Sequence, residues 1–327
     1  MLVSNESQSN PHGEWLEQYS KSELLTELIP YITLVICFIA LVGNGYILLS
    51  FIIVKSLRNN INYVVIILQV FADFLSFGVF IPLAKILRKI ITTTVRMNCI
   101  CEFSASILNE TSSGSCLVFF ALQRFLFVCF PLHAKKVLTP NFHYAFIVIL
   151  GGIIAILTSY ISWNSYLYSS YYNMHYCSFP SLLHFEYHQF RFIIDLFVYH
   201  IPVLICFVLY SAIAIGFIRI KSNSAAKRQR NIELTFIFFL STTMFTFLWL
   251  PQKIMSLLKL FGAEQVLYDL WQCWFFARMN DLSLMLQYSY SAVNPYIFIA
   301  STNPFHILLN RAKVKLGKWI KAIAAWC

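Results

Sequence analysis

The chain has 327 residues, of which 59% are hydrophobic and only 12% are charged. An ordinary soluble domain has about a quarter charged residues, so this chain has too few to cover a soluble fold and is predicted to be an integral membrane protein. Its net charge of +10 does not indicate nucleic-acid binding, because the basic residues flank apolar segments. It instead predicts contact with the anionic lipids of the inner leaflet.

Seven segments are long and apolar enough to cross the hydrocarbon core, which takes about 20 apolar residues in a helix. They cover residues 29–54, 63–87, 99–130, 142–163, 192–220, 232–260 and 274–300. The sequence therefore predicts an all-α membrane protein, a seven-transmembrane helix bundle that forms one domain over residues 29–300. Residues 1–28 form a polar N-terminal segment. In residues 301–327 apolar side chains recur at helical spacing between Lys and Arg, which predicts an amphipathic eighth helix on the inner leaflet.

The distribution of charge predicts how the bundle is oriented. With the N-terminus outside, most Lys and Arg flank the cytoplasmic ends of the spans and most acids lie outside, as the positive-inside rule requires. We therefore expect a multi-pass protein of the plasma membrane with an outer N-terminus. The sequon at Asn5 is a glycosylation acceptor on the outer segment. A second one, at Asn109, lies inside the third span, where we do not expect modification.

Two of the apolar segments contain a proline close to a Trp or an Asn. Residues 245–251 read Phe-Thr-Phe-Leu-Trp-Leu-Pro, and residues 294–298 read Asn-Pro-Tyr-Ile-Phe. A proline inside a membrane helix leaves one carbonyl without its amide partner and kinks the helix, so two such kinks indicate helices built to move. These two runs resemble the sixth and seventh helices of a rhodopsin-like (class A) G-protein-coupled receptor.

Other motifs extend this resemblance over nearly the whole chain. The pairs Gly-Asn at 43–44 and Ala-Asp at 72–73 look like family motifs of the first and second spans, and Gln-Arg-Phe at 123–125 resembles the Asp-Arg-Tyr motif. The resemblance implies a receptor, not an enzyme, that transmits the binding of an extracellular ligand to a heterotrimeric G protein. The residues that it assigns to activation and G-protein coupling are Gln123, Arg124, Phe125, Tyr210, Phe245, Pro251, Pro295 and Phe298.

The resemblance also implies a polar pocket in the middle of the membrane. Asn44, Asp73, Ser113 and Asn294 match family positions that converge around water and a sodium ion, with Asp73 and Ser113 as sodium ligands. An ionised carboxylate at this depth is costly unless it is paired or hydrated. Tyr290 stands where the family usually has a smaller polar residue, so it is expected to crowd this pocket. No other cofactor is expected.

The outer half of the bundle is expected to bind the ligand. The candidate ligand-binding residues are Ser106, Glu110, Trp249, Lys253, Asp195, Arg278 and Asp281, the last three around the mouth of the cavity. Glu110 and Lys253 are predicted to face one cavity, where they either neutralise each other or contact the ligand directly, since buried charges need partners. Ser106 stands where amine receptors carry an Asp, which argues against a biogenic amine.

The class of ligand follows from the chemistry of this mouth. Its charges and the Tyr-rich loop after the fourth span favour a peptide, neuropeptide or chemokine-like, over a lipid. The alternatives within the receptor class are a chemosensory receptor and an agonist-independent or scavenging receptor. A transporter or channel is the alternative of another class, for which internal repeats or a continuous polar helix face are expected. Neither is visible in the sequence.

The resemblance further implies a disulfide between Cys99, at the head of the third span, and Cys177, in the loop after the fourth span. The outer compartment is oxidising, so such a bond would persist and hold the loop over the mouth of the bundle. Cys101 and Cys273 are rival outer thiols.

Four further positions depart from the family pattern. Gln123 and Asn231 stand where acids normally hold the arginine of the motif at rest, Phe298 replaces a Tyr, and Gly114 replaces a bulky aliphatic residue. Tyr210, which receives that arginine when the sixth helix swings out, is retained. The acids that would hold Arg124 in the inactive state are absent, whereas Tyr210, its partner in the active state, is present. We therefore expect elevated basal activity.

Overall fold

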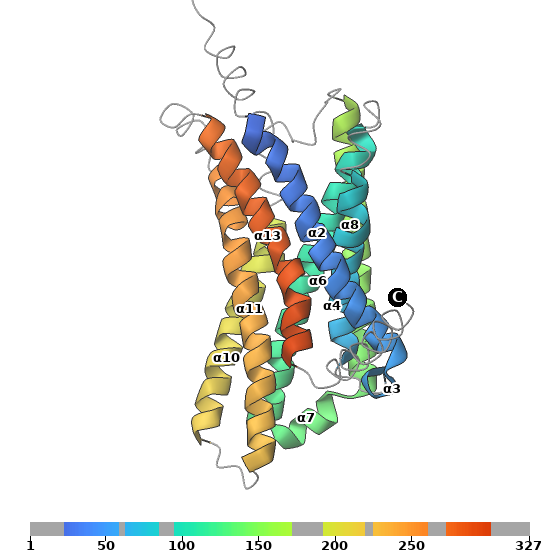
Figure 1. The fold of residues 1–327 in the computed structure, drawn as a ribbon. Helices are drawn as coiled ribbons and strands as arrows, with labels where there is room; N and C mark the ends of the chain where they lie inside the picture. The colour runs from blue at the N-terminus through green and yellow to red at the C-terminus, as the bar shows by residue number, and fades with distance from the viewer. Residues whose placement is uncertain are drawn as a thin grey trace, which may run out of the picture.

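In the computed structural model the protein is a bundle of long helices that run side by side along one axis (Figure 1). The structure describes residues 23–58, 63–84, 95–171, 192–219, 225–260 and 273–301, and no strand occurs among them. In chain order the helical elements are α2 (Glu23–Ile53), α3 (Lys55–Arg58), α4 (Val64–Leu75), η2 (Ser76–Phe80), α6 (Val95–Cys129), α7 (Pro131–Val137), α8 (Pro140–Tyr171), η3 (Leu196–His200), α10 (Ile201–Arg219), α11 (Ala225–Leu260) and α13 (Cys273–Ser301).

Six of the described segments are long and apolar enough to cross a membrane. They are Leu28–Ile53, Val64–Ala84, Ser104–Cys129, Pro140–Tyr160, Phe192–Phe217 and Ile232–Leu258. The seventh expected span corresponds to α13, which packs against α11 and α2 and buries the polar residues Ser283, Gln287 and Asn294. The prediction of a seven-transmembrane helix bundle is therefore confirmed.

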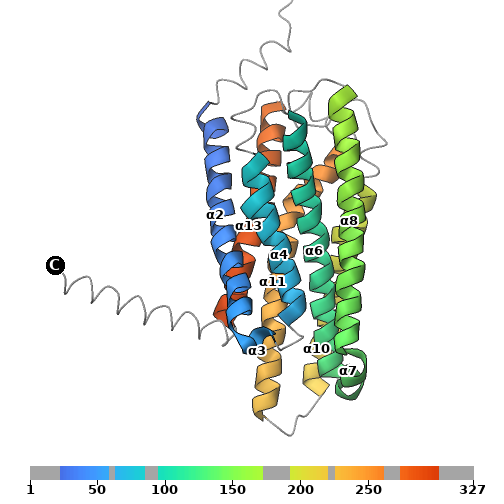
Figure 2. The same ribbon diagram turned by 90° about the vertical axis from the view of Figure 1, so that its right-hand side faces the viewer.

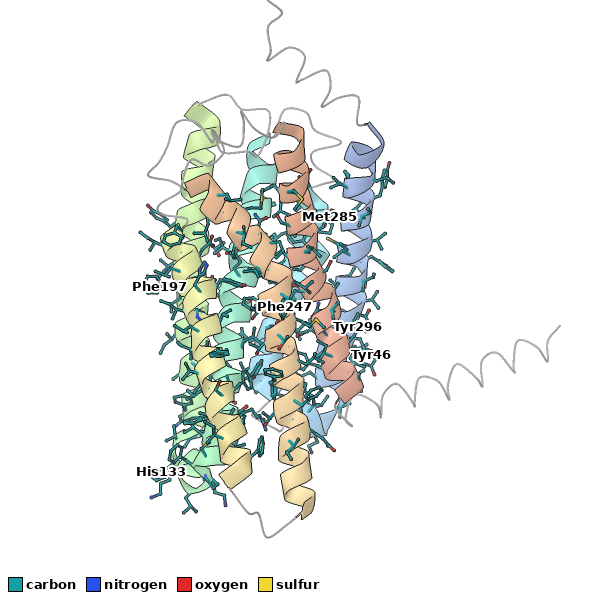
Figure 3. The ribbon with its side chains drawn as sticks, turned by 90° about the vertical axis from the view of Figure 1, so that its left-hand side faces the viewer. Tyr46, His133, Phe197, Phe247, Met285 and Tyr296 are labelled. Carbon is teal, nitrogen blue, oxygen red and sulfur yellow. The ribbon has the colours of Figure 1, made fainter. Side chains whose placement is uncertain are left out.

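Large apolar side chains cover the outside of the bundle. Phe38, Val148 and Phe207 are strongly exposed, and Figure 3 shows such side chains projecting around the helices, Phe197 among them. A water-soluble protein rarely exposes so much contiguous apolar surface. The surface instead fits helices that are solvated by lipid and satisfy their backbone groups internally.

The helix α6 lies in the middle of the bundle. It packs against α4, α8, α10 and α11, and Figure 2 shows it between α4 and α8. Ser112 and Ser113 on this helix are fully buried. A membrane helix surrounded by other helices can carry polar residues, because they face protein and not hydrocarbon. The functional residues on α6 are consequently held in the interior of the bundle.

Two short π-helical segments, η2 and η3, interrupt the second and fifth spans, and the sequence did not predict them. Each π turn contains an extra residue, which rotates the side chains that follow it. Pro202 comes two residues after η3 and has no amide to donate to the carbonyl of Val198.

Gly114 of α6 lies directly against that carbonyl. A Cβ at Gly114 would overlap the oxygen of Val198 and would lie 3.6 Å from Cγ of Pro202. The glycine that departs from the family pattern is thus the residue that allows α6 to approach η3 this closely, since any side chain would need the space that the Val198 carbonyl occupies.

Some predictions fall outside the described residues. These are the sequon at Asn5, the polar N-terminal segment before residue 23, the eighth helix over residues 302–327, and the bond from Cys99 to Cys177. The side chains of Cys99, Asn231, Cys273 and Arg278 lie outside the described part as well, although their helices are described. All of these remain predictions.

Candidate functional site

A cluster of three buried charged side chains joins α6, α11 and the residue before η3. Nζ of Lys253 lies 2.8 Å from Oδ1 of Asp195 and 3.2 Å from Oε1 of Glu110. All three side chains are at most 2% exposed. We call Glu110, Asp195 and Lys253 the charge cluster. Two carboxylates face one ammonium, so the cluster carries one formal negative charge.

Neutral side chains also donate hydrogen bonds to the charge cluster. Ser256 donates to Oδ2 of Asp195 (3.0 Å), and Ser106 and Gln287 both donate to Oε1 of Glu110, at 3.2 and 3.4 Å. Nζ of Lys253 also lies 5.3 Å from the ring centroid of Trp249 and 5.8 Å from that of Tyr199, within the range of cation–π attraction. Buried charges are tolerated in a membrane protein only with such partners.

The sequence-predicted ligand residues divide between this cluster and the rest of the bundle. Glu110 and Lys253 are in contact, as expected, and Ser106 and Trp249 lie beside them. The prediction that Asp195 lies at the mouth is wrong, because its carboxylate is 1% exposed and forms the shortest ion pair of the cluster. Asp281 is partly buried on α13.

A second polar group surrounds Asp73, which is fully buried on α4. Oδ1 of Asp73 accepts hydrogen bonds from Asn109 of α6 and from Ser291 of α13, the latter at 3.1 Å. Asn109 also donates to Ser291 (2.9 Å), and Asn44 of α2 donates to the backbone carbonyl of Ser291 (3.1 Å). Three helices therefore meet at one carboxylate, and α2 joins them through the carbonyl of Ser291. We call Asn44, Asp73, Asn109 and Ser291 the central network.

Asn109 and Ser291 were missed by the sequence analysis as partners of Asp73. Asn109 was identified only as part of a glycosylation sequon, and Ser291, which follows Tyr290, belongs to no recognised motif. The available signal was helical spacing: Asn109 lies one turn before Ser113 on α6, and Ser291 lies one turn before Asn294 on α13, on the same helix faces as the predicted residues.

Ser113 and Asn294 do not bond directly to Asp73 among the described residues. Oγ of Ser113 is buried with no hydrogen-bond partner. Oδ1 of Asn294 instead accepts from Ser241 of α11 at 2.6 Å. Tyr290 accounts for this separation. Its hydroxyl is fully buried, accepts a hydrogen bond from Gln69 (2.9 Å) and lies 3.4 Å from Ser241. The tyrosine ring fills space that a smaller polar residue would leave open for Ser113 and Asn294 to approach Asp73.

The residues present nevertheless fit a sodium ion chemically. Oδ2 of Asp73, Oδ1 of Asn109 and Oγ of Ser113 are buried oxygens without a hydrogen-bond partner among the described residues. Oxygen ligands with at least one carboxylate suit hard cations. Among the described residues no group of three or more His, Cys, Asp or Glu could hold a transition metal.

The far end of α6 carries a third group, around Arg124. Nη2 of Arg124 donates to Oε1 of Gln123 (3.5 Å), and its guanidinium lies 5.1 Å from the ring centroid of Phe238 on α11 and 5.7 Å from that of Phe127. Nε2 of Gln123 lies 3.4 Å from Nε2 of His143 on α8. We call Gln123, Arg124, Phe127, His143 and Phe238 the arginine site.

The tautomer of His143 follows from its neighbours. Its Nδ1 lies 2.9 Å from the carbonyl oxygen of Thr139, which can only accept. Nδ1 therefore carries the proton, and Nε2 is left to accept from the Gln123 amide. Gln123 thus connects α6 to α8 through a neutral hydrogen bond and presents its oxygen to Arg124.

The remaining predicted activation residues lie between these groups. Phe245 contacts Trp249 with ring centroids 4.8 Å apart, and Phe298 packs against Phe120 and Phe238 with centroids 6.4 and 6.1 Å away. Pro251 and Pro295 lie inside α11 and α13. Tyr210 is buried on α10, with its ring 5.5 Å from that of Phe239, and Phe125 contacts Phe130 at 5.5 Å.

Comparison with known proteins identifies the family of this chain. A family model described as 7 transmembrane receptor (rhodopsin family) matches residues 43–298, a range that contains all three polar groups. No curated protein matches the chain. Proteins of this family are membrane receptors and not enzymes, and the family implies an extracellular ligand and a G protein as partners. The chain is a multi-pass membrane protein that belongs to the rhodopsin family of seven-transmembrane receptors.

Proposed function

We propose that the protein is a plasma-membrane receptor, with its N-terminus outside, that binds an extracellular peptide and activates a heterotrimeric G protein. The observation that carries this proposal is the charge cluster, in which Lys253 is held between Asp195 and Glu110. The cluster joins α6, α11 and the fifth span in the half of the bundle that faces outwards in this orientation. A charged ligand that enters this half of the bundle can replace one partner of these buried ion pairs with a charged group of its own.

The chemistry of the charge cluster favours a ligand with charged groups. Separating Lys253 from a carboxylate leaves a buried charge without its partner, which is costly unless the ligand supplies an equivalent one. A peptide offers both signs of charge and backbone groups for Ser106, Ser256 and Gln287, whereas a lipid offers few. The amide and hydroxyls of these three residues already point at the carboxylates.

A continuous series of ring contacts offers a route from the charge cluster towards the arginine site. Lys253 lies over Trp249, which contacts Phe245, and Phe245 in turn contacts Tyr290 with ring centroids 5.3 Å apart. The hydroxyl of Tyr290 lies beside Ser241, the partner of Asn294. A ligand that moves Lys253 therefore changes the packing of Trp249, two residues before Pro251 inside α11.

The sodium ion belongs to this proposal too. Asp73, Ser113 and Asn109 would hold it through their oxygens, and it would supply positive charge beside the Asp73 carboxylate. Because the central network joins α2, α4, α6 and α13, an ion there would stabilise one arrangement of these helices over another.

The test is expression in cells that carry a panel of G-protein activation sensors, read with and without a peptide library. We expect at least one peptide to raise activation in the wild type and Lys253→Met to abolish that response at matched surface level. Lys55→Met, at an exposed lysine outside the charge cluster, should leave it unchanged. Surface-expressed receptor that activates no G protein with or without peptide would overturn the proposal.

A further inference from the structure

A chain of four polar side chains crosses the interior of the bundle between the charge cluster and the arginine site. Nε2 of Gln69 on α4 donates to the hydroxyl of Tyr290 on α13 at 2.9 Å. That hydroxyl lies 3.4 Å from Oγ of Ser241 on α11, and Ser241 donates to Oδ1 of Asn294 on α13 at 2.6 Å. All four residues are fully buried. We call Gln69, Ser241, Tyr290 and Asn294 the hydroxyl chain.

The direction of each hydrogen bond in the hydroxyl chain follows from the donors available. Ser241 has one hydroxyl proton, which points to the side-chain oxygen of Asn294, a group that can only accept. The proton between Tyr290 and Ser241 therefore belongs to Tyr290. Each hydroxyl accepts one bond and donates the next, from the Gln69 amide to the Asn294 oxygen. Hydrogen bonds arranged in such a series polarise and strengthen one another.

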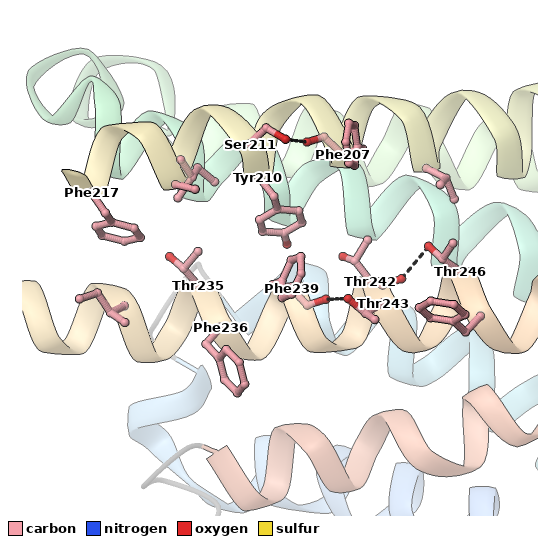
Figure 4. A pocket seen from close by; sticks show the side chains of 15 residues that line it. Phe207, Tyr210, Ser211, Phe217, Thr235, Phe236, Phe239, Thr242, Thr243 and Thr246 are labelled. Carbon is pink, nitrogen blue, oxygen red and sulfur yellow. Dashed lines mark hydrogen bonds between the residues drawn. The ribbon is translucent and has the colours of Figure 1, made fainter. Parts of the chain in front are cut away.

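Ser241 differs from the other hydroxyl residues that follow it on α11. Thr242, Thr243 and Thr246 each donate to the carbonyl one turn earlier in the same helix, at 2.8 to 2.9 Å. Figure 4 shows the bonds of Thr243 and Thr246. Ser and Thr commonly satisfy themselves in this way in membrane helices. The hydroxyl of Ser241 instead reaches across to α13, so it connects two helices.

The hydroxyl chain attaches α11 to its neighbours through this one residue. Gln69 belongs to α4, and Tyr290 and Asn294 belong to α13, so Ser241 is the member that α11 contributes. An outward movement of α11 withdraws the Ser241 hydroxyl from two buried polar groups. A buried polar group that loses its partner costs more than the bond itself contributed. The hydroxyl chain therefore favours the arrangement in which α11 lies against α13.

Tyr290 connects the hydroxyl chain to the ring contacts near the charge cluster. Ser241, Phe245 and Trp249 follow one another at four-residue spacing on one face of α11. The ring centroid of Tyr290 lies 5.3 Å from that of Phe245 and 6.5 Å from that of Trp249. One side chain of α13 thus contacts three successive turns of α11, with its ring at two of them and its hydroxyl at the third.

We propose that the hydroxyl chain holds this receptor at rest, with Ser241 and Tyr290 as the positioning residues that keep α11 against α13. The proposal rests on the proposed function, in which a ligand changes the packing of Trp249 and the sixth helix, α11, swings out. Gln123 and Asn231 stand where acids normally restrain that helix at its cytoplasmic end. The hydroxyl chain supplies a restraint deeper in the bundle, and a shift of Trp249 against the Tyr290 ring releases it.

The first measurement needs neither ligand nor G protein. Fluorescent unnatural amino acids replace Leu132 of α7 and Ile232 of α11, both exposed, in the full-length receptor in phosphatidylcholine nanodiscs, and single-molecule energy transfer follows the distance between them. Ser241→Ala should raise the population with the longer distance about fivefold, which corresponds to the net loss of one hydrogen bond. Ser289→Ala is the matched control, because Ser289 donates to the Met285 carbonyl of its own helix.

Tyr290→Phe separates the hydroxyl from the ring. It keeps the ring contacts and should raise the longer-distance population less than Ser241→Ala does, because the bond from Ser241 to Asn294 at 2.6 Å survives. Added to Ser241→Ala, it should have no further effect, since α11 then has no hydroxyl left to release. Equal distances in Ser241→Ala and Ser289→Ala would overturn the proposal. So would a lower unfolding temperature of Ser241→Ala with unchanged distances, which would show a packing role only.

The second measurement reads G-protein activation without agonist in cells, at equal surface level. Ser241→Ala should raise it by about the same factor as the longer-distance population, and Ser289→Ala should leave it unchanged. If Ser241→Ala lengthens the distance but no G protein responds to any variant, the proposed function fails and the restraint stands. If G proteins respond to the wild type but equally to both variants, the restraint fails and the proposed function stands.

Discussion

The charge cluster, which contains Glu110 near the middle of α6, and the arginine site, near the C-terminal end of that helix, contact their buried charges with different groups. Glu110 meets an opposite charge, the ammonium of Lys253 at 3.2 Å. Arg124 lies against the rings of Phe238 and Phe127 and the neutral amide of Gln123. Breaking a buried ion pair from one side costs about 3 to 5 kcal/mol, whereas a cation–π contact contributes about 0.5 to 2 kcal/mol.

The difference lies in the strength of the individual contacts. Under the proposed function, the charge cluster opens only if a ligand satisfies its charges. The ring contacts of Arg124 are each weaker than an ion pair, and Tyr210 is its expected alternative partner.

The largest effect should follow removal of Lys253. Lys253→Met leaves two carboxylates buried against each other, and we expect it to lower stability by about 3 to 5 kcal/mol and to reduce surface expression sharply. Glu110→Gln should cost less, because the pair of Lys253 with Asp195 at 2.8 Å survives. The measurement is thermal unfolding in detergent together with surface level.

The control for Lys253→Met is a variant that neutralises all three charges of the cluster. Lys253→Met with Glu110→Gln and Asp195→Asn removes every charge of the cluster, so this triple variant should be expressed better than Lys253→Met alone. Strictly additive losses would mean that the three side chains do not interact, and the contrast with the arginine site would disappear.

The second prediction concerns the packing of α6 between its two ends. Gly114→Leu places a side chain where the Val198 carbonyl lies, and overpacking of this kind costs about 1 to 3 kcal/mol. The unfolding temperature should fall. Gly151→Ala is the matched control, because a Cβ there meets nothing within 4 Å and should stabilise α8 slightly. An equal response of the two variants would show that α6 and η3 are not in close contact.

The third prediction concerns a substitution that gives Arg124 a stronger partner. Gln123→Asp places a carboxylate beside Arg124. An ion pair of this type is expected to shift the equilibrium between the active and inactive states towards the inactive state by about 1 to 2 kcal/mol. Agonist-free G-protein activation should therefore fall several-fold at equal surface level. Unchanged or higher basal activation would show that the hydrogen bond between Gln123 and His143, at 3.4 Å, already holds the resting state.

The smallest effect is expected at Phe238. Phe238→Leu removes the ring over which Arg124 lies while it keeps an apolar residue on α11, at a cost of about 0.5 to 1 kcal/mol. Basal activation should rise a few-fold. Phe236→Leu, at a lipid-exposed ring two residues away, is the control and should change little. If both variants behave alike, the contact between Arg124 and α11 does not restrain the receptor.

The sequence by itself determined the architecture and much of the polar interior. Low charge and long apolar segments leave a membrane bundle as the only way to bury this chain. Helical spacing placed Glu110 one turn from Ser106 and Lys253 one turn from Trp249, and a buried charge requires a partner, so the contact between Glu110 and Lys253 could be predicted. The proline positions inside α11 and α13 could be read directly.

Only the tertiary structure decided which residues meet across the helices. Periodicity assigns a side chain to a face, but its partner depends on the rotation and depth of the neighbouring helix. The π turn at η3 begins directly after Asp195, whose carboxylate reaches Lys253 inside the bundle. Tyr290 fills the centre, so Asp73 bonds to Asn109 and Ser291 and not to Ser113 and Asn294. A crevice between α10 and α11, lined by Tyr210 and Phe239 among others, depends on the spacing of the two helices, which no local pattern in either helix specifies.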